Sequence, residues 1–236
     1  MTETVIIFST IFLKNGRIYT PIWSDMIKAG GSMQKLILVG AGGCMREFFW
    51  QINEYNKTNP TWVVEGYVDL AEDLNMENLG ICPYLGDEQY LLTVKEPVNV
   101  AICIANPQKR AELVKMYMQN PNIRFPNVVL SRSNMAPDVS MGQGVIISRN
   151  CTLSANVHLG DFVFLNMESM IAHDSIVGDF STLSYRATVA GNVKVGEGCY
   201  LGISSTCVQG IELGDGVTVA GGVVVKKDVL PGEEVV

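Results

Sequence analysis

The chain has 236 residues, of which 47% are hydrophobic and 17% are charged, so it can bury a substantial core and is not an intrinsically disordered protein. Its net charge of −7 excludes the excess of Lys and Arg with which proteins bind nucleic acids, so we expect no nucleic-acid partner. The six cysteines include no C-x-x-C pair, which favours reduced thiols and a cytoplasmic location.

The longest apolar run near the N-terminus, VIIFSTIFL at residues 5–13, is too short to span a bilayer. It also lacks the basic region and the small-residue cleavage site of a signal peptide. We therefore expect no membrane insertion. A second methionine, Met33, begins the first clear apolar pattern, so residues 1–32 are interpreted as an N-terminal extension of unknown role.

Residues 33–128 predict a Rossmann-like α/β domain. A short apolar strand at 36–39 leads through a glycine turn into a helix, and further strands are expected at 62–69 and 98–105, the last followed by a second helix. This alternation is typical of doubly wound folds, which bind ligands at the carboxyl ends of their strands. Met45 stands where a third glycine of the dinucleotide motif would be, so the turn favours a phosphate or nucleotide cradle over an NAD site.

Residues 129–236 repeat every six residues. Seventeen positions at this spacing, from Val129 to Val225, are all apolar, and the residues two places before them are mostly small or β-branched. Residues two apart on an extended chain point to the same side, so each unit predicts a very short strand followed by a corner.

Glycines that recur in every third repeat then indicate three strands per coil, which is a triangular parallel β-helix, and we expect these glycines to have positive φ: Gly142, Gly160, Gly178, Gly196 and Gly214. Each of the last four glycines is followed by an acidic residue, which we interpret as a turn residue, and no metal site is expected: Asp161, Asp179, Glu197 and Asp215.

His173 lies two places after the inward-facing Ile171, so it is predicted to project outward from a corner. Gly191 follows three repeats later on the same edge, and we expect an open groove above the histidine because glycine has no side chain. An imidazole titrates near neutral pH and can accept the proton of an attacking amine or hydroxyl, while the adjacent Asp174 could orient it. From the residues alone, a solvated surface histidine is the alternative, and this is how His158 is interpreted.

The repeat resembles that of the hexapeptide-repeat acyltransferases, whose β-helix is left-handed. From about Met33 onward, the chain is similar to the sialic-acid-type sugar O-acyltransferases and to the N-acetyltransferases of UDP-linked 4-amino sugars in bacillosamine synthesis. The most specific portion matches N-(x)6-H-[DE]-x-x-[IV]-G-[DE]-[FY] and starts at Asn166. The resemblance implies a homotrimer that transfers an acetyl group from acetyl-CoA to a sugar or nucleotide-sugar, with His173 as the base, Asp174 assisting it and Asn166 matching a family asparagine.

The resemblance also assigns the binding positions. Acetyl-CoA would lie along one column in a groove between subunits, at Thr182, Gly191, Ile203 and Gly221. The nucleotide-sugar would contact Gly42, Gly43, Cys44, Asp69, Leu70 and Ala105. Thr182 stands where many relatives have a histidine, although a hydroxyl could donate the same hydrogen bond to the thioester.

Several alternatives stay open. Cys44, Leu70 and Ala105 replace a histidine, an aspartate and a glycine of the bacillosamine-type pattern, so the acceptor could differ from a UDP-amino sugar. A sialic-acid-type sugar hydroxyl and an amino acid are the other acceptors considered. A non-catalytic binding or scaffold protein is the alternative from another class, which Thr182, Cys44 and the short C-terminus favour slightly and which the intact Asn166, His173 and Asp174 oppose.

Overall fold

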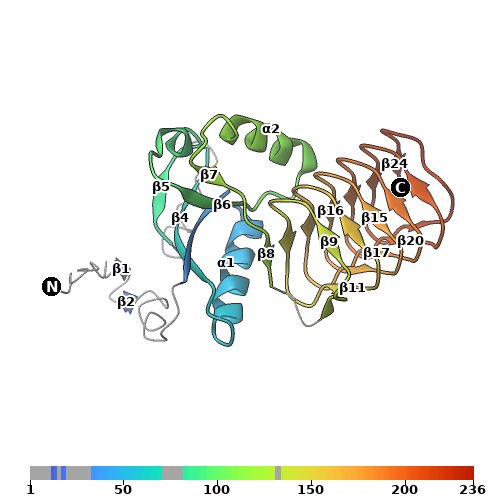
Figure 1. Ribbon diagram of the computed structural model, residues 1–236, viewed down its shortest axis with the longest axis horizontal. Helices are drawn as coiled ribbons and strands as arrows, with labels where there is room; N and C mark the ends of the chain where they lie inside the picture. The colour runs from blue at the N-terminus through green and yellow to red at the C-terminus, as the bar shows by residue number, and fades with distance from the viewer. Residues whose placement is uncertain (1–11, 15–16, 20–32, 71–81, 131–133) are drawn as a thin grey trace.

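The computed structural model describes residues 12–14, 17–19, 33–70, 82–130 and 134–236. It consists of an α/β part and a β-helix that extends away from it and ends at the C-terminus (Figure 1). Most of the predicted N-terminal extension lies outside the described residues. The described pieces of it are two short antiparallel strands, β1 (Phe12–Lys14) and β2 (Arg17–Tyr19).

The α/β part is built on a parallel five-stranded sheet of order β5-β4-β3-β6-β7. Its strands are β3 (Gln34–Val39), β4 (Trp62–Val68), β5 (Tyr84–Gly86), β6 (Val98–Ile102) and β7 (Ile123–Arg124). The helices are α1 (Gly43–Asn56), the 3-10 helix η4 (Tyr90–Thr93) and α2 (Pro107–Tyr117). The three predicted strands and both predicted helices are present, and β5 and β7 complete the sheet.

The two α-helices cover opposite faces of this sheet. Leu36 and Leu38 of β3 belong to the core cluster that contains α1, whereas Ile37 and Val39 belong to the cluster that contains α2. Successive side chains of a strand point to opposite faces, so a strand that is apolar throughout is buried between two layers. The continuous apolar run of β3 therefore reflects its central position in three layers.

The β-helix has three parallel faces made of two-residue strands. The junction face packs against the α/β part and contains seven strands: β8 (Val128–Val129), β10 (Ile146–Ile147), β13 (Phe164–Leu165), β16 (Thr182–Leu183), β19 (Tyr200–Leu201), β22 (Thr218–Val219) and β24 (Glu234–Val235). The threonine face contains five: β11 (Thr152–Leu153), β14 (Met170–Ile171), β17 (Thr188–Val189), β20 (Thr206–Cys207) and β23 (Val224–Val225). The third face contains β9 (Ser140–Met141), β12 (His158–Leu159), β15 (Ile176–Val177), β18 (Lys194–Val195) and β21 (Glu212–Leu213).

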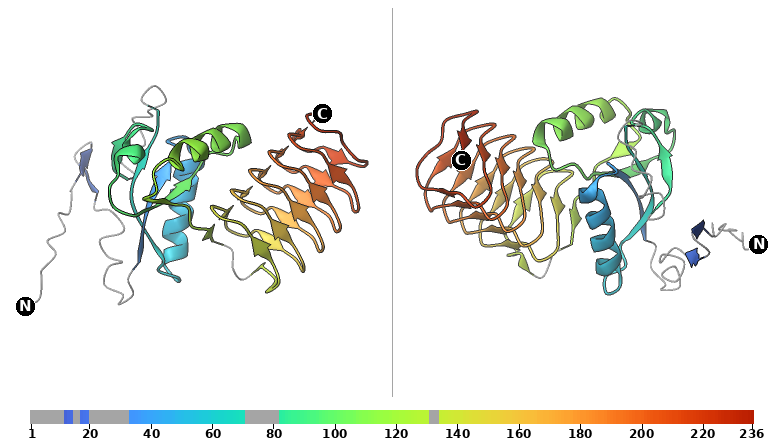
Figure 2. Two further views of the ribbon diagram at one scale, coloured as in Figure 1. Left: turned by 45° about the horizontal axis from the view of Figure 1, so that its top comes forward. Right: turned by 180° about the vertical axis from the view of Figure 1, so that it is seen from behind.

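The coils stack in register with three repeats per turn, as the pairing of Ile171 with Val189 illustrates (Figure 2). The predicted six-residue period is confirmed, because every sixth residue from Ile147 to Val225 is buried inside the prism. Two serines of the second inward column donate their hydroxyls to backbone carbonyls: Ser175 Oγ to Ala190 O at 2.8 Å and Ser181 Oγ to Gly196 O at 2.7 Å. Three corners separate the faces, and we number them in chain order from the junction face, so that residues 166–168, 172–174 and 178–180 lie in the first, second and third corner of one coil.

The glycines that recur in every third repeat have a different role from the one predicted. Positive φ values fall two residues later, at every sixth residue from Gly144 to Gly222, so the expectation of positive φ at Gly142, Gly160, Gly178, Gly196 and Gly214 is wrong. These glycines allow close contact between coils, because a Cβ on Gly160 would lie 2.7 Å from the backbone nitrogen of Asp179. The Asp179 carboxylate reaches across this contact and accepts a hydrogen bond from the Asp161 N–H at 2.8 Å.

The α/β part and the β-helix share one packed junction. The outward side chains of Ile146 and Phe164 are buried in the core cluster of α1, and Phe162 is buried in that of α2. Within the described part of the chain, no helix has the length and apolar character needed to cross a membrane.

Candidate active site

His173 lies in the second corner of the β-helix, between β14 and β15, and its side chain is 52% exposed. Its Nδ1 is 2.8 Å from Oδ2 of Asp174, the next residue in the chain. A carboxylate accepts hydrogen bonds, so this contact favours the tautomer that carries its proton on Nδ1. Nε2 then has its lone pair available, and it makes no hydrogen bond to the described residues. The predicted outward projection is confirmed.

Gly191 lies one coil above His173, because the N–H of Asn192 donates to the His173 carbonyl at 2.9 Å. The position agrees with the prediction, but the expected open groove is wrong. A Cβ on Gly191 would lie 2.7 Å from both Cε1 and Nε2 of the imidazole. The ring therefore covers the bare backbone of Gly191, and the glycine is needed for the position of the ring.

Asp174 is held from the opposite side by Asn156, whose Nδ2 donates to its Oδ1 at 2.8 Å. This hydrogen bond, followed by that from His173, holds the pKa of the Asp174 carboxyl below its ordinary value. The carboxylate therefore stays ionised wherever an imidazole could act as a base. Asn156 is a site residue that the sequence prediction misses, although it lies three repeats before Asp174, which is one coil.

Asn166 lies in the first corner, at the opposite end of β14 from His173, so one chain does not bring these two residues together. It is buried, and its Oδ1 accepts a hydrogen bond from the Met167 N–H at 2.8 Å. Its side chain also bonds to Tyr185, whose hydroxyl donates to the Glu47 carboxylate of α1. Burial and Glu47 raise the pKa of Tyr185 to about 12, so the phenol keeps its proton at neutral pH.

The four positions predicted to bind acetyl-CoA do not form a single column, and this expectation is wrong. Ile203 and Gly221 stack in the first corner, with a Cβ on Gly221 3.2 Å from the Ile203 carbonyl oxygen, whereas Gly191 lies in the second corner. Residues stack only when they are three repeats apart, and the steps from Thr182 to Gly191 and from Gly191 to Ile203 are both shorter.

Thr182 does not offer a free hydroxyl to a thioester, so this expectation is wrong. It lies on the junction face and is 1% exposed. Its Oγ1 donates to the Ala105 carbonyl at 2.7 Å and accepts from Nη2 of Arg110 at 2.9 Å. Because its one proton is already donated, Thr182 joins the β-helix to the α/β part and does not face a thioester.

The predicted acceptor positions lie at one edge of the sheet, after the carboxyl ends of β3, β4 and β6: Gly42, Gly43, Cys44, Asp69, Leu70 and Ala105. Gly42 is the N-cap of α1 and has open space around it, since an added Cβ would meet no atom within 4 Å. A helix N-terminus with open space in front of it suits an anionic group. Asp69 is largely buried, and its Oδ1 accepts from the Leu70 N–H at 2.8 Å.

Cys44 sits in this group, but burial raises the pKa of its thiol to about 12. The thiols of the other five cysteines also have raised pKa values, chiefly because of burial. The thiolate is the nucleophilic form of cysteine, so none of these residues is prepared to carry an acyl group.

Arg110 of α2 is buried at the junction and donates only to uncharged groups of three segments. Nε donates to Phe162 O at 2.9 Å, Nη1 to Ile104 O at 2.6 Å and to Ala105 O at 3.2 Å. Nη2 donates to the carbonyls of Phe180 and Ser181 and to Thr182. Burial lowers the pKa of Arg110 to about 9, which leaves it charged at neutral pH. The guanidinium thus joins the loop after β6 to the β-helix.

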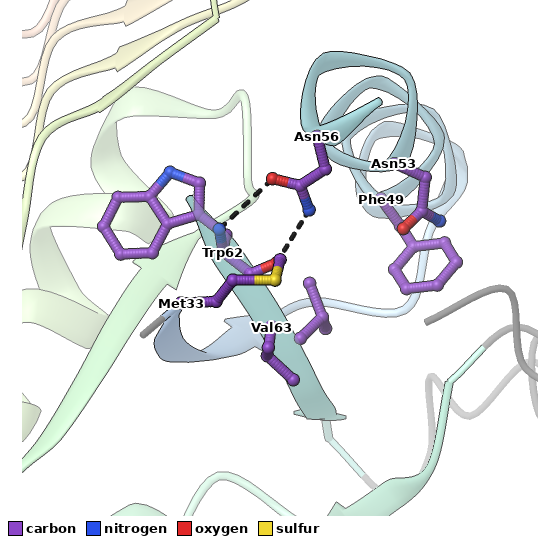
Figure 3. Close-up of a pocket in the computed structure, with 7 residues that line it drawn as sticks. Met33, Phe49, Asn53, Asn56, Trp62 and Val63 are labelled. Atoms are coloured by element: carbon purple, nitrogen blue, oxygen red, sulfur yellow. Dashed lines mark hydrogen bonds between the residues drawn. The ribbon is translucent and has the colours of Figure 1, made fainter. Parts of the chain in front are cut away.

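A small pocket in the α/β part lies between α1 and the start of β3 and β4, apart from all of these residues (Figure 3). There the side chain of Asn56 bonds to the backbone of Trp62, donating to its carbonyl at 2.7 Å and accepting from its N–H at 3.2 Å. These contacts join the end of α1 to β4, so the pocket belongs to the packing of the α/β part. Among the described residues, no group of three or more His, Cys, Asp or Glu side chains could hold a metal ion.

Residues 192–227 match the family described as the hexapeptide repeat of succinyl-transferase. No curated protein matches the chain significantly.

Solved structures with a similar fold include the following three. The acetyltransferase domain of PglB from Neisseria gonorrhoeae, in complex with acetyl coenzyme A, is 21% identical with a TM-score of 0.71 over 86% of this chain and 96% of its own. PerB from Caulobacter crescentus, in complex with CoA and GDP-perosamine, is 22% identical with a TM-score of 0.72 over 86% and 94%. WeeI from Acinetobacter baumannii is 21% identical with a TM-score of 0.62 over 86% and 96%. The chain therefore has the fold of these proteins.

Proposed function

We propose that the chain is an acetyltransferase that moves an acetyl group from acetyl-CoA to the amino group of a sugar, with a nucleotide-linked amino sugar as the leading acceptor and a sugar hydroxyl as the alternative. The observation that carries this proposal is the His173–Asp174 pair, which is exposed, hydrogen-bonded at 2.8 Å and oriented with Nε2 available. This is the arrangement of a general base with its orienting carboxylate.

The similar structures support acetyl-CoA as the acyl donor and a nucleotide-linked amino sugar as the acceptor. The PglB domain is in complex with acetyl coenzyme A, and PerB is in complex with CoA and GDP-perosamine, the substrate of a GDP-perosamine N-acetyltransferase. The open N-terminus of α1, with Gly42 and Gly43, could accept the phosphates of such a nucleotide.

In the proposed mechanism, His173 Nε2 takes a proton from the amine as its nitrogen attacks the carbonyl carbon of the thioester. The new N–C bond forms, the C–S bond breaks, and the proton on the imidazolium passes to the departing thiolate. Asp174 stabilises the imidazolium through Nδ1. Because every cysteine thiol stays protonated, we propose direct transfer without a cysteine-linked acyl-enzyme.

We also propose a homotrimer in which the threonine face lies toward the threefold axis. Its outward side chains carry no charge, and Met170 and Val224 are 46% and 48% exposed, so burying this face costs no desolvated ion. This face separates the second corner from the first. Around a threefold axis, the His173 corner of one chain would meet the Asn166, Ile203 and Gly221 corner of its neighbour, which assembles residues that a single chain keeps apart.

The division of the chain remains part of the proposal. We propose that residues 33–128 form a Rossmann-like acceptor-binding domain, that residues 129–236 form a left-handed β-helix, and that residues 1–32 are an extension. The parallel sheet with helices on both faces supports the first assignment, and the resemblance supports the left-handed sense.

The proposed base is tested by His173→Ala, with His158→Ala as the matched control. His158 is the other histidine of the chain, is also exposed, and bonds to Ser140 at 2.5 Å on the third face. Acetyl transfer from labelled acetyl-CoA is measured by mass spectrometry with GDP- and UDP-amino sugars, sialic acid and serine. We expect His173→Ala to lose about 10²–10⁴-fold in kcat and His158→Ala to match the wild type.

Wild-type turnover in His173→Ala would remove the proposed mechanism. A wild type that acetylates no acceptor and gains no thermal stability from CoA would instead favour a non-catalytic binding or scaffold protein, since a ligand at 100 times its Kd stabilises by about 2.7 kcal/mol.

A further inference from the structure

Asn156, Asp174 and His173 form a continuous line of hydrogen bonds on the second corner. Asn156 Nδ2 donates to Asp174 Oδ1 at 2.8 Å, and Asp174 Oδ2 is 2.8 Å from His173 Nδ1. Each oxygen of the carboxylate therefore has its own partner. The Asn156 backbone is fixed in turn, because its N–H donates to Oδ2 of Asp138 at 3.0 Å.

The β-helix itself sets this line. Asn156 and Asp174 occupy the same corner position one coil apart, with φ values of 56° and 59°. Parallel strands in register lie about 4.8 Å apart, so equivalent side chains of successive coils can bond directly. Asn and Asp tolerate positive φ better than most residues, which explains why this ladder can be built from corner residues.

We propose that Asn156 is a positioning residue that holds the Asp174 carboxylate against His173 and thereby fixes the tautomer of the base. This inference rests on the proposed function in taking His173 as the base. The Asp174 side chain is 47% exposed, so water and other rotamers compete for its oxygens. The amide of Asn156 restrains the carboxylate from the side opposite to the imidazole. Without it, His173 loses a fixed acceptor at Nδ1, and the proton moves to Nε2 in part of the molecules, where it blocks the lone pair.

The test is Asn156→Gly, which removes the amide and leaves a residue that adopts positive φ freely. Asn192→Gly is the matched control. Asn192 occupies the same corner position one coil above Asp174, with φ 57°, and its side chain makes no hydrogen bond within the described chain. Both variants thus make the same backbone change, and only one removes the donor to Asp174.

We expect kcat of Asn156→Gly to fall about tenfold, a fraction of the 10²–10⁴-fold typical of a general base, with both KM values unchanged. The acid limb of its kcat/KM profile moves to lower pH, because a loosely held carboxylate stabilises the imidazolium less. Asn156→Asp replaces the donor with a carboxylate beside Asp174 and should be more impaired than Asn156→Gly. Asn192→Gly should keep the wild-type kcat and profile.

A second readout does not depend on turnover. The chain has two histidines, so long-range nitrogen–proton NMR of labelled imidazoles, assigned with His158→Ala, reports the tautomer of His173 directly. We expect the proton on Nδ1 in the wild type and in Asn192→Gly, and a mixture in Asn156→Gly. An unchanged tautomer and pH profile in Asn156→Gly overturn the inference, even if thermal stability falls. An inactive His173→Ala beside a fully active Asn156→Gly leaves the proposed function standing and removes only this inference, whereas an active His173→Ala removes the proposed function.

Discussion

The position of one imidazole depends on a residue that has no side chain. The His173 ring covers the backbone of Gly191 in the next coil, where an added Cβ would be 2.7 Å from two ring atoms. The obstacle is the end of an exposed side chain, which can rotate away into solvent. At Gly178 the obstacle is backbone, because a Cβ there would lie 2.6 Å from the Gly196 carbonyl carbon. The two glycines therefore have opposite consequences when they are replaced.

Gly191→Ala should displace the ring and lower kcat about 10²-fold while the melting temperature stays near that of the wild type, since about 1 Å of misplacement can cost this much. Gly178→Ala should lower the melting temperature, because overpacking costs about 1–3 kcal/mol of folding free energy, while kcat stays near that of the wild type. Calorimetry and acetyl-transfer kinetics on both variants check this. Equal loss of stability in the two variants would contradict the assigned role of Gly191.

At the scale of elements, α2 and the β-helix are joined through Arg110, which pairs with no carboxylate among its hydrogen-bond partners. A buried charge is costly unless its donors are satisfied, and here they are satisfied by carbonyls and one hydroxyl. The planar guanidinium can reach several segments at once, which a lysine cannot.

Arg110→Met should destabilise the protein by about 2–4 kcal/mol, because it leaves several buried carbonyls without their donor. Arg110→Lys should recover only part of this. Equilibrium unfolding in urea measures the change, and limited proteolysis is expected to cut first at the junction in Arg110→Met. If Arg110→Met left the free energy of unfolding unchanged, the contacts of Arg110 with Phe162 and Ile104 would be dispensable for stability.

The sequence predicts the β-helix well because its period is regular, and a step of three repeats correctly stacks Gly191 on His173. The same step of three repeats could have found Asn156 one coil below Asp174. It could also have shown that the residues predicted to bind acetyl-CoA do not form a single column. Tyr185 and Glu47 are different, since they lie in different parts of the fold, far apart in the chain, and no local pattern joins them. The burial of Thr182 likewise depends on how the α/β part docks, which no periodicity encodes.

For the whole molecule, the proposed trimer is tested on the threonine face. Met170→Glu would place a charge at the interface, so we expect light scattering to detect monomers and acetyl transfer to be lost. Ile176→Glu is the control, because Ile176 is 43% exposed on the third face and should leave the trimer intact. Trimers of Met170→Glu with full activity would exclude this face from the interface.

Attachment of the β-helix at one end has a mechanical consequence. Outward residues of β10, β13 and β16 are buried under the α/β part, whereas those of β19 and β22 are only partly covered. The prism is thus supported at its early coils and has a free end at the C-terminus (Figure 2). Fraying should start at the free tip and reach Ile203 and Gly221 before His173. The proposed base, His173, lies near the attached end, where we expect thermal bending to move it least.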